Sequence, residues 1–205
     1  VYDIRDPSRP TFAGDLPMPG GGGYVFVKDD LAFEGAGDSA GGYIFDISDL
    51  SNIEVVGNVS LEGDLDTVTP IGNVAILSVD AGANDGQGSA VAPYALEPDT
   101  TPPFVTWAWP PPDAVVAPTS RFGVTFNEFV DPKSAFEGSV RLYRTGEPET
   151  GRIPGTVSAQ ESIVNFHPFC ALEPGSYTLE VMADGIVDFN GNVVDVPYAQ
   201  TITVE

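Results

Sequence analysis

Apolar and polar residues alternate along much of the second half of the chain. The alternation is clearest in three runs, whose apolar members are Phe122, Val124 and Phe126, then Val164 and Phe166, then Tyr177, Leu179 and Val181. A period of two with polar partners is typical of half-buried antiparallel strands. Further β-type runs at 105–109, 139–143, 153–158 and 201–205 bring the expected strands to about seven. That number within about 100 residues predicts an Ig-like β-sandwich.

The first half of the chain repeats itself, with Ile4 corresponding to Ile47 at an offset of 43 residues. The run 1–8 aligns with 44–51 without a gap, and its apolar, aromatic, Asp and Ser positions coincide. Strands are expected at 24–27, 31–34, 43–47 and 54–59, between Gly, Asp, Asn and Ser clusters that are typical of turns. A repeat of this length, with about four short strands per copy, indicates propeller blades rather than a helical solenoid.

A proline pair, Pro102 and Pro103, separates the two halves. Two consecutive prolines fix φ and remove two backbone donors, so neither a helix nor a central strand can run through them. We therefore expect propeller-type repeats over 1–97, a linker at 98–103 and a sandwich over 104–205. The expected fold class is all-β, a partial β-propeller of about two blades plus an Ig-like β-sandwich.

The repeated stretch resembles a known bacterial family. Residues 43–49 read Tyr-Ile-Phe-Asp-Ile-Ser-Asp, and 2–7 read Tyr-Asp-Ile-Arg-Asp-Pro. Both resemble the LVIVD repeat, in which a hydrophobic run ends in Asp-Val/Ile-Ser-Asp-Pro, although Leu50 stands where the family has its proline. The resemblance implies a β-propeller of surface or secreted proteins. Propellers need about 4 to 8 blades, so we expect further blades upstream of Val1, in a longer parent chain.

The second half resembles a bacterial Ig-like domain. Its motifs are Thr-Pro-Pro at 101–103, Val-Thr-Phe-Asn-Glu-Phe-Val-Asp-Pro at 124–132, Leu-Glu-Pro-Gly-Ser-Tyr-Thr-Leu at 172–179 and Asp-Phe-Asn-Gly-Asn at 188–192. Phe129 departs from the family, which usually has proline there. The resemblance implies a spacer or surface-display module without catalytic residues. It also explains Asp188, Asn190 and Asn192 as a hairpin turn.

The chain is strongly acidic, with 30 Asp and Glu against 8 Lys and Arg and a formal net charge of −22. Such a charge repels nucleic acids and anionic membrane surfaces, so we expect neither as a partner. No apolar run is long enough to predict a membrane span. The single cysteine, Cys170, cannot form an intrachain disulfide and is expected to be a small buried hydrophobe.

The sequence contains one pattern that is typical of a catalytic site. Residues 37–41 satisfy G-x-S-x-G around Ser39. A nucleophile elbow needs a strand before it and a helix after it, whereas a strand is expected to follow here. The one histidine, His167, lies in the other half of the chain, between Phe166 and Pro168, and is expected to pack at a strand end. The sequence therefore predicts no enzyme.

The loop 80–86 is the best candidate for a metal site. Asp80, Asn84 and Asp85 supply oxygen atoms on a turn-rich segment, which is what Ca²⁺ prefers. The spacing does not satisfy the EF-hand loop, because no Glu stands at its last position. We expect no cofactor, because acidic loops are commonly solvated turns, and calcium at this loop is the alternative.

Phe104, Trp107 and Trp109 form an aromatic group beside the proline pair. Residues two apart on a strand point to the same face, so both indoles are expected to be buried or both presented. If presented, they would form an apolar interface with the preceding blade or with another subunit. The alternative, both rings inside the sandwich, stays open because tryptophan is highly buried on average.

We therefore expect a non-catalytic structural, adhesive or partner-binding module of a secreted or cell-surface bacterial protein. Its expected partners are other domains of the parent chain or other protein subunits, in a possible surface assembly. The alternative is an accessory region of a larger secreted enzyme whose active site lies outside these residues.

Overall fold

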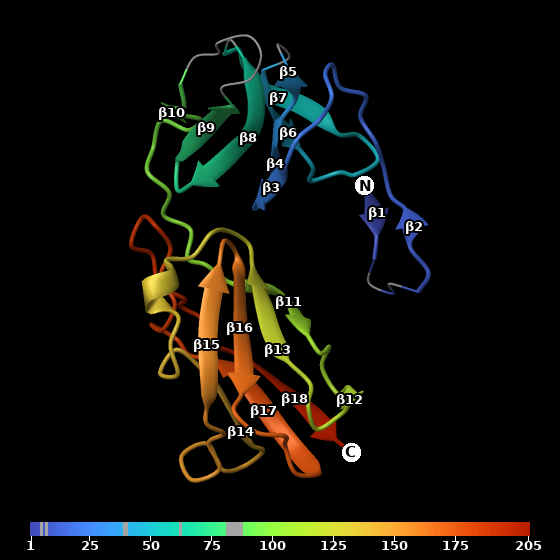
Figure 1. The fold of residues 1–205 in the computed structure, drawn as a ribbon. Coiled ribbons are helices and arrows are strands. Elements are labelled where there is room, and N and C mark those ends of the chain that lie inside the picture. Colours follow the sequence, from blue (N-terminus) through green and yellow to red (C-terminus); the bar gives the residue numbers. More distant parts are fainter. Residues whose placement is uncertain (5, 7, 39–40, 62, 81–87) are drawn as a thin grey trace. The chain divides into compact units, whose positions relative to one another are not determined.

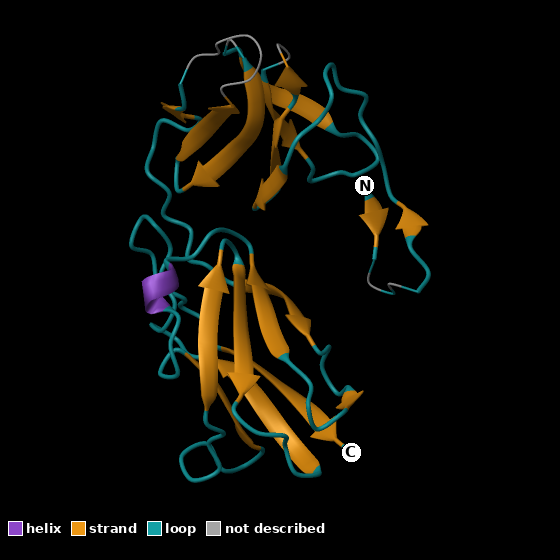
Figure 2. Ribbon diagram, in the orientation of Figure 1, coloured by secondary structure: helices purple, strands orange, loops and turns teal. Residues whose placement is uncertain are grey.

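The computed structural model describes residues 1–205 except 5, 7, 39–40, 62 and 81–87. The chain divides into two compact units, Val1–Pro98 and Asp99–Glu205. Strands and loops make up both units, and the one helical element of the described residues is the 3-10 turn η1 (Pro132–Ser134) (Figure 2). The expected all-β class is confirmed.

The first unit contains a short hairpin and two four-stranded antiparallel sheets (Figure 1). Its strands are β1 (Tyr2–Asp3), β2 (Thr11–Phe12), β3 (Val25–Lys28), β4 (Leu31–Gly35), β5 (Gly37–Asp38), β6 (Gly42–Asp46), β7 (Glu54–Val59), β8 (Asp64–Ile71), β9 (Val74–Asp80) and β10 (Ala90–Pro93). One sheet has the order β3-β4-β6-β7, the other β10-β9-β8-β5, and β1 pairs with β2. These described strands close no ring.

Strand pairing in this unit repeats at the offset found in the sequence. The pairs Tyr2–Phe12 and Asp3–Thr11 recur as Phe45–Val55 and Asp46–Glu54, and the four pairs from Val25–Glu34 to Lys28–Leu31 recur as those from Val68–Leu77 to Ile71–Val74. The hairpin β1–β2 is thus equivalent to β6–β7, and β3–β4 is equivalent to the end of β8 with β9. The repeat of the pairing ends at β10. Ala32 pairs with Phe45, so the offset of 43 residues would pair Ala75 with Gly88, but Ala75 pairs with Ala92, four residues farther along the chain.

The turns repeat with the strands. The amide and the hydroxyl of Ser8 donate to Asp6 Oδ1 at 3.1 and 2.7 Å, and those of Ser51 donate to Asp49 Oδ1 at 2.9 and 2.6 Å. An aspartate that accepts from a residue two positions on forms an Asx turn. The hydrogen bonds from the Ser51 side chain and backbone hold the pKa of Asp49 below its usual range. The turn therefore forms without the family's proline at Leu50.

The core of the first unit lies between its two sheets. The main cluster of buried residues consists of Phe33, Leu65, Val68, Ala75 and Leu77. Gly35 lets the sheets approach closely, because a Cβ on this residue would lie 2.3 Å from the carbonyl oxygen of Leu65. A larger residue at this position would push the two sheets apart.

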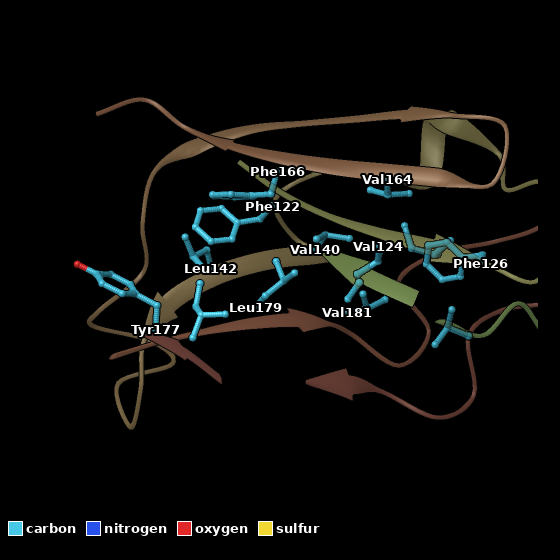
Figure 3. Packing of buried hydrophobic residues seen from close by; sticks show 14 of the residues in the cluster. Phe122, Val124, Phe126, Val140, Leu142, Val164, Phe166, Tyr177, Leu179 and Val181 are labelled. Carbon is cyan, nitrogen blue, oxygen red and sulfur yellow. The ribbon is translucent and has the colours of Figure 1, made fainter. Parts of the chain in front are cut away.

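The second unit is a sandwich of two four-stranded sheets. Its strands are β11 (Val105–Trp109), β12 (Val115–Val116), β13 (Phe122–Phe126), β14 (Val140–Arg144), β15 (Gly155–Gln160), β16 (Ile163–Pro168), β17 (Gly175–Val181) and β18 (Tyr198–Val204). The sheet orders are β11-β13-β16-β15 and β12-β18-β17-β14. Alternate residues of both sheets meet in one core (Figure 3). The predicted Ig-like sandwich is confirmed.

The first edge of the sandwich changes sheet between β11 and β12. β11 pairs with β13 in one sheet, and β12 runs parallel to the last strand, β18, in the other. Three backbone hydrogen bonds join this edge to β18, from the Asp113 amide to the Thr201 carbonyl, from Thr203 to Ala114 and from Glu205 to Val116. The two-residue β12 was not expected from the sequence.

Tyr177 anchors the loop that leads into β17. Its ring is fully buried at one end of the core, and its hydroxyl donates to the carbonyl of Glu173 at 2.7 Å (Figure 3). The Arg144 guanidinium lies 5.3 Å from the centre of the ring. A tyrosine whose hydroxyl returns to the backbone a few residues upstream is the tyrosine corner of Ig-like sandwiches. It gives the Leu-Glu-Pro-Gly-Ser-Tyr motif its structural role.

Candidate functional site

Three carboxylates that are far apart in sequence meet in the second unit. Asp99, Glu128 and Asp188 each offer an oxygen atom, and these atoms lie within 4.8 Å of one another. Glu128 is only 1% exposed and Asp188 only 3%. Asp99 is the first residue of the unit, Glu128 follows β13, and Asp188 forms an isolated bridge with Val130. The fold therefore brings three acidic groups into a largely buried cluster.

Asparagine side chains hold this cluster together. Asp188 Oδ1 accepts from the backbone amides of Asn190 and Asn192, both at 2.8 Å, and its Oδ2 accepts from the Asn192 side-chain Nδ2 at 2.7 Å. Asn192 Nδ2 also donates to the carbonyl of Asp99 at 3.0 Å. Asn127 Nδ2 donates to Glu128 Oε1 at 3.3 Å. The turn that the sequence predicts at 188–192 thus also binds the first residue of the second unit, Asp99, through the Asn192 side chain.

The cluster has the donor set of a hard-cation site. Carboxylate oxygens are the ligands that Ca²⁺ prefers, and carboxylates this close together repel one another unless a proton or a cation lies between them. Asp99, Glu128 and Asp188 are therefore the residues of the described chain that could hold a metal ion. Sequence reasoning missed this grouping, because the three residues lie on separate segments and only the tertiary pairing brings them together.

The loop predicted to bind calcium is only partly described. Asn84 and Asp85 lie outside the described residues. Asp80 is exposed at the end of β9, where it pairs with Asp64 at the start of β8. Calcium at this loop stays a prediction.

Asp66 lies near Asp64 and Asp80 in the same sheet. Burial raises the pKa of Asp66, and the negative charges of Asp80 and Asp64 raise it further. Because the folded pKa lies above the unfolded one, ionised Asp66 destabilises the first unit at neutral pH. This penalty disappears as the pH falls through the folded pKa.

Asp66→Asn is therefore expected to stabilise the β8–β9 pair at pH 7 and to have little effect at a pH below the pKa of Asp66. Hydrogen exchange of the β8 amides measures the change, and Asp30→Asn, at an exposed position in the β3–β4 turn, is the matched control. Comparison of the two variants at each pH removes the intrinsic pH dependence of exchange. Equal exchange in both variants at pH 7 would contradict the prediction.

Both tryptophans lie on the outer face of the sandwich. Trp107 is 53% exposed and Trp109 is 51% exposed, whereas Ala108 between them is buried. The two indoles are stacked, with ring centres 6.3 Å apart and planes inclined by 21°. Phe104, just before β11, is also exposed. The structure therefore decides between the two alternatives in favour of presented rings, while their role as a protein interface stays a prediction.

The G-x-S-x-G segment is followed by a strand. Ser39 lies outside the described residues, but β5 before it pairs with β8, and β6 begins at Gly42. His167 lies in the second unit, on β16. A nucleophile elbow requires a helix directly after the motif. Among the described residues, the strand β6 stands there instead.

Cys170 is exposed, so the expectation of a buried cysteine was wrong. It follows β16 in a turn, where the alternation of inward and outward positions no longer applies. Arg121, His167 and Cys170 line one shallow hollow of about 240 Å³.

An apolar hollow of about 460 Å³ lies between the two sheets of the first unit. Its walls include Leu31, Ile44, Val56, Ala92 and Tyr94. None of the described residues that line it carries a charged side chain.

In the described part of the chain, no helix is both long and apolar enough to cross a membrane.

The eight strands, the two sheet orders and the tyrosine corner define the second unit as an Ig-like β-sandwich domain. The sequence matches the bacterial Ig-like domain family over residues 99–204, and the chain belongs to this family. The resemblance read from the motifs of the second half is confirmed.

Two solved structures are similar to about half of the chain. PcoC, a methionine-rich copper resistance protein from Escherichia coli, is 19% identical with a TM-score of 0.42, and the match covers 51% of this chain and 100% of PcoC. The N-terminal part of the bacterial S-layer protein SbsC is 18% identical with a TM-score of 0.38, over 51% of this chain and 24% of that one. No curated protein matches the sequence.

Proposed function

We propose that the chain is a non-catalytic structural and partner-binding module of a secreted or cell-surface bacterial protein. The observation that carries this proposal is the bacterial Ig-like domain at residues 99–204. Its core is continuous across both sheets, as a spacer domain requires. The net charge of −22 would keep such a surface soluble and separated from other acidic molecules.

For the first unit, we propose blades of an LVIVD-type propeller within a longer parent chain. The support is the strand pairing that recurs at an offset of 43 residues, together with a core packed between two four-stranded sheets. A propeller consists of such sheets arranged around an axis. Its outer surfaces would contact the other domains or subunits expected as partners.

Location at the cell surface is tested in the bacterium that produces the protein. Antibodies against the second unit are expected to bind intact cells or to detect the chain in the medium. The control is a cytoplasmic protein, which intact cells should not expose. Detection of this chain only after the cells are broken would contradict the proposal.

The absence of a serine nucleophile is tested with a fluorophosphonate probe. Because a strand rather than a helix follows the G-x-S-x-G motif, the chain is expected to remain unlabelled, and Ser39→Ala should not change this result. A known serine hydrolase confirms that the probe is reactive. Labelling that is lost in Ser39→Ala would instead identify an active nucleophile and support an enzyme.

A further inference from the structure

The β11-β13-β16-β15 sheet is free of charged residues. Its strands read Val-Thr-Trp-Ala-Trp, Phe-Gly-Val-Thr-Phe, Ile-Val-Asn-Phe-His-Pro and Gly-Thr-Val-Ser-Ala-Gln. None of these positions is Asp, Glu, Lys or Arg, although the chain has 30 acidic and 8 basic residues. This sheet therefore presents an uncharged surface on a strongly acidic protein.

Strand register arranges the outward side chains in rows across the sheet. In one row Trp109 lies beside Gly123, which pairs with Asn165, and Asn165 pairs with Ser158. The next row runs from Trp107 through Thr125 and Ile163 to Gln160. Neighbouring strands lie about 4.8 Å apart, so each row is about 14 Å long. We call this surface, defined by Trp107, Trp109, Asn165, Ser158 and Gln160, the indole face.

Gly123 contributes to the shape of the indole face. A Cβ at this position would lie 2.9 Å from Asn165 Oδ1, so the Asn165 amide lies over the glycine backbone. The glycine leaves room for this amide next to Trp109. An amide and an indole therefore lie side by side in one row.

The polar groups of the indole face are not used within the fold. Among the described residues, the side chains of Asn165, Ser158 and Gln160 form no hydrogen bond to protein, and none has a further interaction. Ser158 and Gln160 are exposed, and Asn165 is partly exposed. They remain able to donate to and accept from a ligand.

The chemistry of this surface selects a particular ligand. The two indoles offer apolar surface, and the amides and hydroxyls beside them match a ligand that is rich in hydroxyl groups. The net charge of −22 disfavours anionic polymers. Serine is depleted at protein interfaces, whereas Ser158 stands on this face and can donate to and accept from the hydroxyls of a ligand.

We propose that the indole face binds an uncharged polysaccharide, with sugar rings against Trp107 and Trp109 and hydroxyls bonded to Asn165, Ser158 and Gln160. This site goes beyond the structural role proposed above, because a spacer domain does not require a ligand.

Tryptophan fluorescence of the full chain tests the site directly, because both tryptophans of the protein lie on the indole face. The uncharged probes are soluble hydroxyethylcellulose and laminarin, with pull-down on microcrystalline cellulose and on chitin. At least one of the four is expected to change the emission or to retain the chain. Polygalacturonate, which is anionic, should do neither.

Variants assign the binding to residues. Trp107→Ala and Trp109→Ala are each expected to weaken retention at least about tenfold, as is typical of a central aromatic anchor. Phe136→Ala removes an exposed aromatic ring elsewhere on the same unit and should leave binding unchanged. Thermal unfolding checks that all three variants remain folded.

Three results would overturn the proposal. The first is no response to any of the four uncharged probes. The second is equal retention of the tryptophan variants and the wild type. The third is a contact with protein instead of polysaccharide, seen as self-association that is lost in Trp107→Ala, or as indoles that acrylamide cannot reach in the free chain. None of these results would affect the surface location or the probe labelling that test the structural role.

Discussion

Tyr177→Ala is expected to destabilise the sandwich by about 3–5 kcal/mol, the usual cost of removing a large aromatic ring from a core. The ring is fully buried, and the substitution also removes the hydroxyl that bonds to the Glu173 carbonyl. A domain has about 5–15 kcal/mol of stability in total, so this loss would bring the second unit close to unfolding. Urea unfolding followed by tryptophan emission measures the second unit alone, since both tryptophans belong to it.

Tyr177→Phe is the matched control, because it keeps the ring and removes only the hydrogen bond. Its expected cost is about 0.5–1.5 kcal/mol. If Phe and Ala at this position cost the same, the corner would depend on the hydroxyl rather than on the buried ring, and the argument from packing would be wrong.

Asn192→Ala is expected to cost about 2–3 kcal/mol. Its side-chain amide donates to the Asp188 carboxylate and to the Asp99 backbone carbonyl. A hydrogen bond to a charged group contributes about 1.5–3 kcal/mol and one between neutral groups about 0.5–1.5 kcal/mol. The substitution replaces a neutral side chain by another neutral one, and it removes a donor from the buried Asp188 carboxylate. Asn192 is therefore the least ambiguous position at which to test the cluster.

Asn190→Ala, two residues away in the same turn, provides the control. The Asn190 side chain is exposed, and only its backbone amide bonds to Asp188. Its replacement is expected to change stability by less than about 0.5 kcal/mol. Equal effects at the two asparagines in the same urea measurement would show that the turn, and not the Asn192 side chain, holds the cluster.

Alternation was a reliable guide wherever one face of a strand is buried. β13, β16 and β17 lie where the period of two placed them, and the ranges of β11 and β7, predicted as β-type runs without the alternation argument, were also correct. β12 was missed because two residues are too short to show a period. The 43-residue repeat does not continue beyond β9. The edge strand β10 therefore pairs with β9 four residues beyond the position that the repeat predicts.

The functional surfaces were only partly predictable. Spacing alone placed Trp107 and Trp109 on one face, but which face is buried depends on the partner strand β13. The carboxylate cluster gave no local signal, since Asp99, Glu128 and Asp188 meet only when the start of the unit packs against two later turns. Cys170 was misplaced because it stands just beyond the end of a strand.

The parallel pairing of β12 with β18 has a mechanical consequence. A domain that linked other parts of a protein would be pulled from its two ends, and here the first edge and the last strand of the sandwich lie side by side. Tension between these ends loads the three hydrogen bonds of Asp113, Thr203 and Glu205 together, in shear, instead of opening them one after another. The parallel pairing of β12 with β18 would therefore resist a pulling force along the two strands.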